Sequence, residues 1–249
     1  MRRVNVIGIG AGDPEHLTLQ AIRAMNEVDV FFHVAKGAEK GQLAQLRLDL
    51  CAEHITGDYR WVEVMDPERD RTGPGYTAAV GDWHEARAEL FETLLRDELT
   101  ADQTGGLLVW GDPALYDSTL RVLDRVAARG TVAFEHRVIP GITSPQTLAA
   151  QHKIPWNRIG GAVQVTTGRR LEAGFPTEAD DVLVMLDAHC SFAHLPADTE
   201  IYWGAYLGTP DEILLSGTVG SVGPQIERVR AEARETKGWI MDTYLLRRP

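Results

Sequence analysis

The sequence predicts an α/β fold with a mostly parallel sheet in its first half and a mixed sheet in its second half. Over residues 1–140, apolar β-branched runs alternate with segments of helical period, which is the pattern of strand–helix–strand units. Over residues 141–249 the expected strands follow one another closely and helices are fewer, which favours partly antiparallel pairing. We therefore expect two α/β domains, 1–140 and 141–249, which a chain of 249 residues can form.

Apolar runs and turn residues locate the elements of the first half. Helices are indicated where apolar residues recur every three or four positions, as Leu19 and Ile22 do. Asp117 or Ser118 is expected to cap a later helix, and Gly130 is expected to end it. The predicted strands are 4–9, 30–32, 107–110 and 131–139, and the other predicted helices are 18–28 and 78–99.

The second half is expected to open with a helix and to continue mainly as strands. Ser144 followed by Pro145 is typical of an N-cap and a proline at the first helical position. Short apolar runs then predict strands at 163–167, 182–186, 200–204, 212–215 and 239–246, and the clearest later helix is 222–234.

Composition excludes several classes of protein. The chain has 25 Lys and Arg against 36 Asp and Glu, a net charge of −11, which disfavours a nucleic-acid partner. Cys51 and Cys190 have no metal-ligand spacing and are expected to be reduced, so no metal site is predicted. The apolar run after Met1 is too short for a signal peptide or a membrane span, so we expect a cytoplasmic protein without a membrane partner.

The first predicted strand ends in a glycine-rich turn at residues 8–12 that lets the backbone approach a ligand closely. A dinucleotide-binding turn would have its third glycine one residue later and an acidic residue at the end of the second strand. His33 occupies that end and Asp29 lies at the start of the strand, which disfavours a nicotinamide cofactor. A turn that binds no ligand is the other interpretation.

Two further turns follow predicted strands, at residues 111–116 and 140–144. Ligands of open α/β sheets bind outside the carboxyl ends of the strands, so three such turns predict the rim of one pocket. Asp112 is suited to accept hydrogen bonds from a ligand, and Thr143 and Ser144 are suited to offer hydroxyl and backbone groups.

The three turns read GIGAGD at 8–13, GDP at 111–113 and PGITS at 140–144. In this order, and across the whole chain, they resemble the tetrapyrrole (corrin/porphyrin) methylase family. Five more segments resemble the branch of that family that methylates precorrin-5 at C1: 66–71, 109–121, 165–170, 201–210 and 237–244.

The resemblance implies a two-domain fold with the active site in the cleft between the domains, and usually a homodimer. It implies S-adenosyl-L-methionine as methyl donor, which leaves as S-adenosyl-L-homocysteine. Carried over by position, the donor-binding residues are Gly10, Ala11, Gly111, Asp112, Pro113, Leu115, Thr143, Ser144, Met185, Leu186 and Ala205. The implied reaction is C1-methylation of precorrin-5 with release of acetate, which gives precorrin-6A in cobalamin biosynthesis.

Methyl transfer from a sulfonium needs alignment of the donor with the carbon that is methylated more than it needs a nucleophilic side chain. The sequence therefore does not identify the catalytic residues. Release of acetate calls for a general base, and Asp13, Asp66, Tyr116 and Asp117 are suitable by residue type. For Asp13 a helix cap is the favoured role, and for Tyr116 a place in the pocket wall.

The substrate carries many carboxylates, and the guanidinium fork matches a carboxylate. The candidate substrate-binding residues are therefore Arg69, Arg71, Arg121, Arg169 and Arg170, each of which is alternatively a solvated surface charge. A small-molecule tetrapyrrole is the expected partner.

Other functions remain open at this stage. Another precorrin methyltransferase, or diphthine synthase acting on a protein histidine, would keep the family and change the substrate. A non-catalytic protein that binds tetrapyrrole or donor belongs to a different class. Turnover of precorrin-5 with release of acetate separates the first reading from all of these.

Overall fold

The computed structural model describes residues 1–35, 41–68 and 76–248. The chain separates into two compact units. We call residues 1–10 and 14–142 unit 1, and residues 11–13 and 143–249 unit 2. The expected division into two domains after residue 140 stays a prediction.

Unit 1 contains five parallel strands in the order β3-β2-β4-β1-β5. The central strand β4 and its neighbour β1 are buried almost throughout, because helices cover both faces of the sheet. The strands are β1 (Arg2–Gly8), β2 (Val30–Ala35), β3 (Arg60–Met65), β4 (Thr104–Val109) and β5 (Phe134–Ile139).

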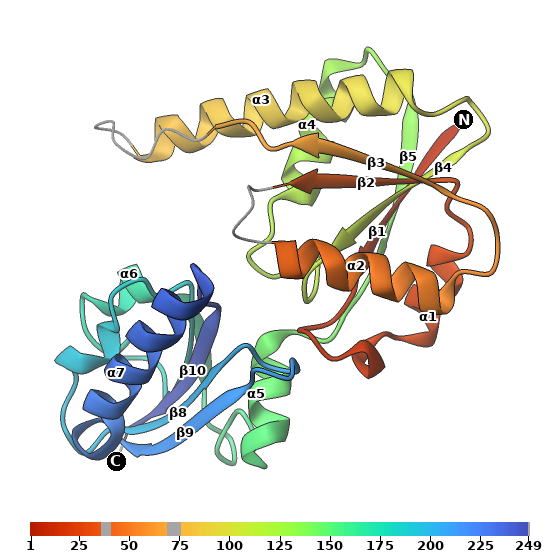
Figure 1. Cartoon of the computed structure of the whole chain (residues 1–249). Coiled ribbons are helices and arrows are strands. Elements are labelled where there is room, and N and C mark those ends of the chain that lie inside the picture. The colour runs from red at the N-terminus through yellow and green to blue at the C-terminus, as the bar shows by residue number, and fades with distance from the viewer. Residues whose placement is uncertain (36–40, 69–75, 249) are drawn as a thin grey trace. The chain divides into compact units, whose positions relative to one another are not determined.

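Helices cover both faces of this sheet (Figure 1). Helices α1 (Leu19–Met25) and α2 (Gly41–His54) pack on the face that carries Phe31 and Leu108. Helices α3 (Tyr76–Asp97) and α4 (Thr119–Arg129) pack on the opposite face, against Phe32 and Leu107. Neighbouring residues of one strand thus enter different cores, as the alternation of a strand requires.

The connections out of β1 and β4 create a switch point in unit 1. Strands β1 and β4 are neighbours, but the chain leaves β1 for α1 on one face and leaves β4 for α4 on the other. Ligands of open α/β sheets bind at the carboxyl ends of strands whose connections diverge in this way. The short helix η1 (Pro14–His16) lies in the connection that follows β1.

Unit 2 contains a mixed sheet in the order β6-β7-β10-β8-β9. Only β6 and β7 are parallel, and the other neighbours are antiparallel. The strands are β6 (Val163–Thr167), β7 (Asp181–Met185), β8 (Glu200–Ala205), β9 (Ile213–Thr218) and β10 (Asp242–Arg247). The helices are α5 (Ser144–His152), α6 (Gly168–Leu171), η3 (Ser191–His194) and α7 (Val219–Lys237).

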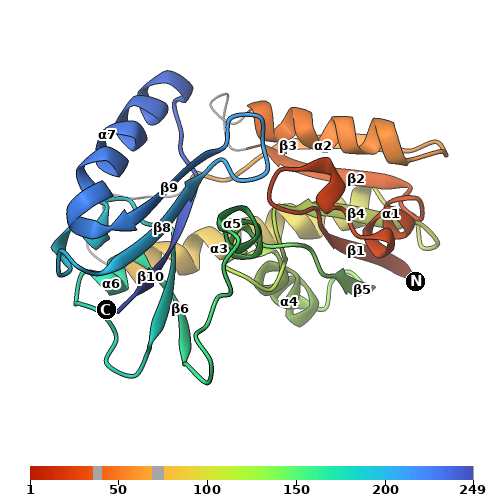
Figure 2. The same ribbon diagram turned by 90° about the horizontal axis from the view of Figure 1, so that it is seen from below.

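Helices α5 and α7 cover opposite faces of this second sheet. Leu245 of β10 packs with Leu148 of α5 in one core. The next residue along the strand toward the N-terminus, Tyr244, points to the other face and meets Phe192 edge-on at 5.4 Å. Helix α7 lies on that second side, along β8 and β9 (Figure 2).

The expected α/β class, with a parallel first sheet and a mixed second sheet, is confirmed. Two elements of unit 1, α2 and β3, were not predicted from the sequence. The cap of α5 is Thr143 and not Ser144, which is the first helical residue, so the expected cap was wrong by one position. In the part of the chain that the structure describes, none of the helices has the length and apolar content that crossing a membrane requires.

Candidate functional site

The turns after β1 and β4 are joined directly at the switch point of unit 1. Gly10 and Gly111 form an antiparallel bridge, in which the Gly111 N–H donates to the Gly10 carbonyl at 2.8 Å. The reciprocal bond from the Gly10 N–H to the Gly111 carbonyl measures 3.4 Å. Both glycines have positive φ, 82° and 68°, which is a conformation that other residues rarely adopt.

The turn after β5 closes against the same place. A Cβ on Gly8 would lie 2.6 Å from the Gly141 nitrogen and 2.7 Å from the Gly111 carbonyl oxygen. Backbone therefore packs on backbone where the three turns meet, and glycine is required because any side chain would separate them. The structure thus brings together the turns at 8, 111 and 140 within unit 1, as the sequence led us to expect.

Asp112 ties two of these turns together. Its Oδ1 accepts a hydrogen bond from the Ala114 N–H at 2.7 Å, and its Oδ2 accepts one from the Gly141 N–H at 2.9 Å. A carboxylate can accept further bonds, so Asp112 can still contact a ligand. Its first role in the structure is to hold the turn geometry. Pro113 is buried beside it and Leu115 is half-buried.

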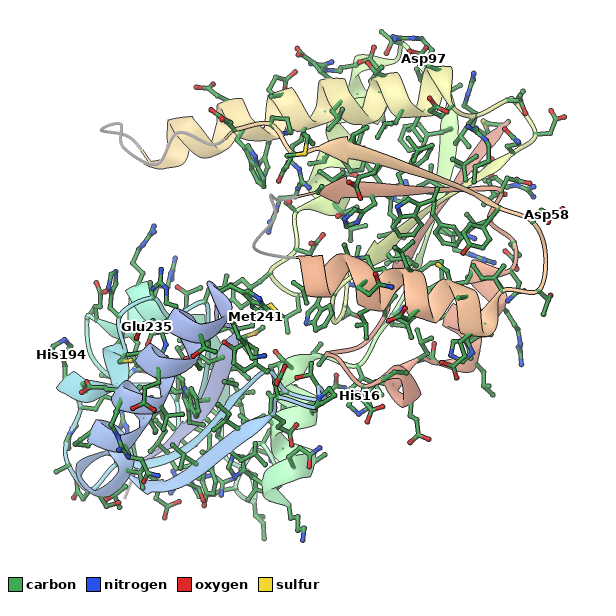
Figure 3. The ribbon with its side chains drawn as sticks, in the orientation of Figure 1. His16, Asp58, Asp97, His194, Glu235 and Met241 are labelled. Carbon is green, nitrogen blue, oxygen red and sulfur yellow. The ribbon has the colours of Figure 1, made fainter. Side chains whose placement is uncertain are left out.

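His16, labelled in Figure 3, lies behind Gly10. A Cβ on Gly10 would meet the His16 Cβ at 2.7 Å, so there is no room for a side chain at residue 10. The buried Nδ1 of His16 has no hydrogen-bond partner among the described residues.

The donor-binding residues predicted in unit 2 lie at one edge of its sheet. Met185 ends β7, Leu186 follows it directly, and Ala205 ends β8. Both strands pair with β10, where Thr243 is the partner of Met185 and Asp242 is the partner of Ala205. The two carboxyl ends therefore lie at the same level, with the beginning of β10 between them. Met241, labelled in Figure 3, immediately precedes β10 at this edge.

The backbone at this edge is strained in the same way after each strand. Leu186 has φ 54° and is 65% exposed, and Tyr206 has φ 51°. Tyr116, in the turn after β4 of unit 1, has φ 53°. Non-glycine residues in this region cost free energy and concentrate at functional sites. Strain after three strand ends therefore marks these turns as candidate ligand-binding segments.

A buried polar network holds the loop after β7. Asp187 accepts hydrogen bonds from the Tyr244 hydroxyl at 2.6 Å and from the Ser191 hydroxyl at 2.9 Å. Burial raises the pKa of Asp187, but these bonds and two backbone N–H groups leave it lowered overall. Arg230 of α7 donates to the Asp187 carbonyl at 2.6 Å and to Asp242 at 2.9 Å. The network fixes the loop that carries Leu186.

The other three predicted donor-binding residues of unit 2 lie in the segment 11–13 and at the start of α5. Ala11 is buried in the segment 11–13, where Gly12 approaches the Leu207 carbonyl. Thr143 uses its N–H and its hydroxyl in a capping box with Gln146, so both groups serve the helix. Ser144 is half-buried at the first position of α5.

The candidate bases occupy four different settings. Asp66 follows β3 and forms an ion pair of 2.8 Å with the buried Arg87, which also donates to Ser118. Asp117 accepts a bond from the Thr119 N–H at 2.7 Å in the turn before α4, whose N-cap residue is Ser118. Tyr116 is 42% exposed in its strained turn. Asp13 is half-buried, and the cap of α1 is Thr18 and not Asp13.

The candidate substrate arginines are scattered. Arg69 and Arg71 lie outside the described residues. Arg121 is exposed on α4, and Arg169 and Arg170 are exposed on α6. Arg121 is in unit 1 and the α6 pair is in unit 2, so the structure does not collect them into one cluster within either unit.

The sequence prediction missed a basic residue at the carboxyl edge of unit 1. Arg47 of α2 donates from Nε to the Leu108 carbonyl on β4 at 3.1 Å. Burial lowers the pKa of Arg47 to about 10, against the opposing charge of Asp117. No helix was predicted over 41–54, because its apolar residues do not form a clear stripe, so this arginine had no expected position.

The sequence led us to expect no metal site and two reduced cysteines. The described residues contain no group of three His, Cys, Asp or Glu side chains that is arranged to hold a metal ion. Cys51 and Cys190 are free and buried, and burial raises their thiol pKa to about 12 and about 11. Such thiols are poor nucleophiles at neutral pH.

Comparison with known proteins identifies relatives over the full length. The family model described as Tetrapyrrole (Corrin/Porphyrin) Methylases matches residues 3–223. Precorrin-6A synthase (deacetylating) from Sinorhizobium sp is 52% identical over 250 aligned residues, which cover 100% of this chain and 96% of that relative.

Solved structures agree with this comparison. The cobalamin synthesis related protein CobF from Corynebacterium diphtheriae is 38% identical, with a TM-score of 0.86 over 99% of this chain and 98% of its own. Uroporphyrin-III C-methyl transferase from Thermus thermophilus, complexed with S-adenyl homocysteine, is 19% identical with a TM-score of 0.59. The alignment covers 98% of this chain and 96% of that chain, and at this identity it shows a shared fold.

Proposed function

Because the chain belongs to the tetrapyrrole (corrin/porphyrin) methylase family, we propose that it methylates precorrin-5 at C1 and releases acetate, which yields precorrin-6A. The observation that carries this conclusion is the 52% identity to a deacetylating precorrin-6A synthase, which extends over the whole chain. The chain is accordingly a methyltransferase of cobalamin biosynthesis, and its substrate is a small tetrapyrrole.

We propose S-adenosyl-L-methionine as the methyl donor. The glycine turns at the switch point of unit 1 support this proposal, because Gly10 and Gly111 carry no side chain at the strand ends where ligands of α/β sheets bind. When bound, the donor supplies a methyl group that its sulfonium charge has already activated.

We propose the eleven residues inferred from the sequence as donor-binding residues. In unit 1 they are Gly10, Gly111, Asp112, Pro113 and Leu115, around the bridged turns. In unit 2 they are Ala11, Thr143, Ser144, Met185, Leu186 and Ala205, which lie at strand ends and at the start of α5. Their shared contribution is a preorganised backbone, which serves alignment more than chemical catalysis.

Methylation breaks the bond between sulfur and the methyl carbon and forms a bond from that carbon to C1. Release of acetate then requires water to add to the acetyl carbonyl, after which the carbon–carbon bond breaks and the macrocycle keeps the electron pair. A general base takes the proton of the water. We propose Asp13, Asp66, Tyr116 and Asp117 as the candidates for this base, of which Asp66 is paired with Arg87.

The carboxylates of the substrate call for cationic partners on the protein. We propose Arg69, Arg71, Arg121, Arg169 and Arg170 for this role, of which the last three are exposed and accessible. We also propose that the protein is a cytoplasmic homodimer, and sedimentation equilibrium should return twice the chain mass of 27.5 kDa.

Purified protein tests the proposed function directly. Incubation with precorrin-5 and S-adenosyl-L-methionine carrying a ¹³C-methyl group should give precorrin-6A labelled at C1, together with free acetate in equal amount. NMR follows the labelled carbon, and an enzymatic assay measures the acetate. A reaction without donor is the control and should give neither product.

The outcomes separate the remaining functions. Methylation without acetate would overturn the deacetylating activity and leave another precorrin methyltransferase. Tight binding of S-adenosyl-L-homocysteine without turnover of precorrin-5 would favour a non-catalytic binder.

A further inference from the structure

Arg47 lies at the carboxyl edge of the unit 1 sheet, close to the candidate site. Its Nε donates to the carbonyl of Leu108, three residues before Gly111 of the bridged turn. Its Nη1 donates to the Leu43 carbonyl in the preceding turn of α2 at 2.7 Å. These two bonds fix the guanidinium beside the end of β4.

Helix α2, which carries Arg47, packs on a face of the sheet that is rich in aromatic side chains. His33 of β2 lies on the same face of the sheet as Phe31, since alternate strand residues share a face. Its ring stacks on Trp61 at 5.5 Å, and its side chain is only 10% exposed. Trp110 packs against the same core. Arg47 is half-buried on this face, and a cation that is partly withdrawn from water attracts an anion more strongly than a fully solvated one.

Arg47 has no carboxylate in ion-pair contact within the described part of the chain. Asp117 is near enough for its charge to act on Arg47, but no ion pair or hydrogen bond joins them. The other well-buried arginines differ in this respect, since Arg87 contacts Asp66 and Arg230 contacts Asp242. A half-buried charge is normally paired, so Arg47 has the setting of a residue that receives an external anion.

We propose that Arg47 binds a carboxylate side chain of the tetrapyrrole substrate, with the neighbouring His33 as a second polar contact. The inference rests on the proposed function and adds a substrate-binding residue to it. The unused edge of the guanidinium matches a carboxylate in a planar, two-bond contact, which lysine does not reproduce.

Steady-state kinetics with precorrin-5 test the role of Arg47. In Arg47→Met the KM for precorrin-5 should rise roughly tenfold or more, as for a lost charged hydrogen bond, while kcat changes little. The KM of Arg47→Lys should lie between those of the unaltered protein and Arg47→Met. This variant provides the test if Arg47→Met does not fold. The dependence of KM on salt should weaken in Arg47→Met, because one screened charge contact is gone.

Arg23→Met is the matched control. Arg23 is exposed on α1 of the same unit, and its substitution removes the same charge. Its KM should equal that of the unaltered protein. Calorimetric titration with S-adenosyl-L-homocysteine should give one dissociation constant for all four proteins.

Three results would overturn the inference. An unchanged KM in folded Arg47→Met and Arg47→Lys would remove Arg47 from the substrate site. An equal loss of S-adenosyl-L-homocysteine binding would show that Arg47 only supports the end of β4. Absence of any precorrin-5 turnover by the unaltered protein would overturn the proposed function itself, and this inference with it.

Discussion

Gly10 adopts φ 82° and has the Cβ of His16 directly behind it. Both features oppose a side chain, the first through local backbone strain and the second through a clash with a neighbour. The turn can therefore present its amide and carbonyl groups to Gly111, and through them shape the candidate donor pocket.

Gly10→Val should abolish measurable binding of S-adenosyl-L-homocysteine in a calorimetric titration. The valine would push apart the turn and η1, and the pocket would lose its shape. Gly130→Val is the control, since Gly130 also has positive φ but has open space around it. That variant should lose stability and keep donor affinity. Unimpaired binding by Gly10→Val would refute the position assigned to the pocket.

His33 is a second residue whose setting has a measurable consequence. Burial lowers its pKa, the charge of Arg47 lowers it further, and Glu63 opposes both. Below the ordinary value of about 6.5 the unfolded chain takes up a proton that the folded protein resists. The free energy of unfolding should therefore fall as the pH drops from about 7 to about 5.

Urea unfolding at several pH values isolates this contribution. His33→Gln removes the titrating group, so its stability should fall less steeply than that of the unaltered protein over this range. His136→Gln, at an exposed position on β5, controls for the loss of a histidine. Identical pH profiles for the unaltered protein and His33→Gln would contradict the lowered pKa.

At the scale of elements, the Arg87 side chain of α3 connects the segments that follow β3 and β4. Arg87 contacts Asp66 after β3 and Ser118 before α4, and its guanidinium stacks on Trp83 with 4.6 Å to the ring centroid. The pair is almost fully withdrawn from water, so each partner would be left as a buried charge without the other.

Arg87→Met should lower the free energy of unfolding by about 3 kcal/mol, because Asp66 stays behind unpaired. Arg125→Met removes an exposed pair with Glu85 on the same layer of helices and should cost at most about 1 kcal/mol. Denaturant unfolding of both variants measures the contrast. Equal small losses would mean that water reaches the Asp66 site.

At the scale of the whole molecule, a ligand that binds only the folded protein must stabilise it. S-adenosyl-L-homocysteine at about one hundred times its dissociation constant should add roughly 2.7 kcal/mol to the free energy of unfolding, which thermal unfolding detects as a higher Tm. NAD⁺ is the control and should leave Tm unchanged, because the glycine turn departs from the dinucleotide pattern. A higher Tm with NAD⁺ and an unchanged Tm with S-adenosyl-L-homocysteine would favour a nicotinamide cofactor instead.

Much of the fold could be predicted because its strands are buried and its turns are chemically distinctive. The expected strand at 163–167 coincides with β6, and Gly130 ends α4 with φ 67° as expected. Helix α2 and strand β3 were missed. Charged residues interrupt the apolar pattern of both, and tertiary packing, not local periodicity, stabilises them.

The candidate site divides in the same way. The glycine turns and Asp112 could be singled out, since a close backbone approach leaves a mark in the sequence. The hydrogen-bond and ion-pair partners of individual polar groups could not be predicted. The Thr143 hydroxyl caps a helix, Asp66 is paired with an arginine from another element, and Arg47 lies on the helix that was missed.

The sequence by itself determined the α/β class, most of the strands, the family and the three turns that carry its motifs. Only the tertiary structure decided that β4 is inserted between β1 and β2, which makes Gly10 and Gly111 partners across 101 positions of chain. The reason is physical: periodicity records which face of an element is buried, but the partner that buries it is chosen by packing among distant segments.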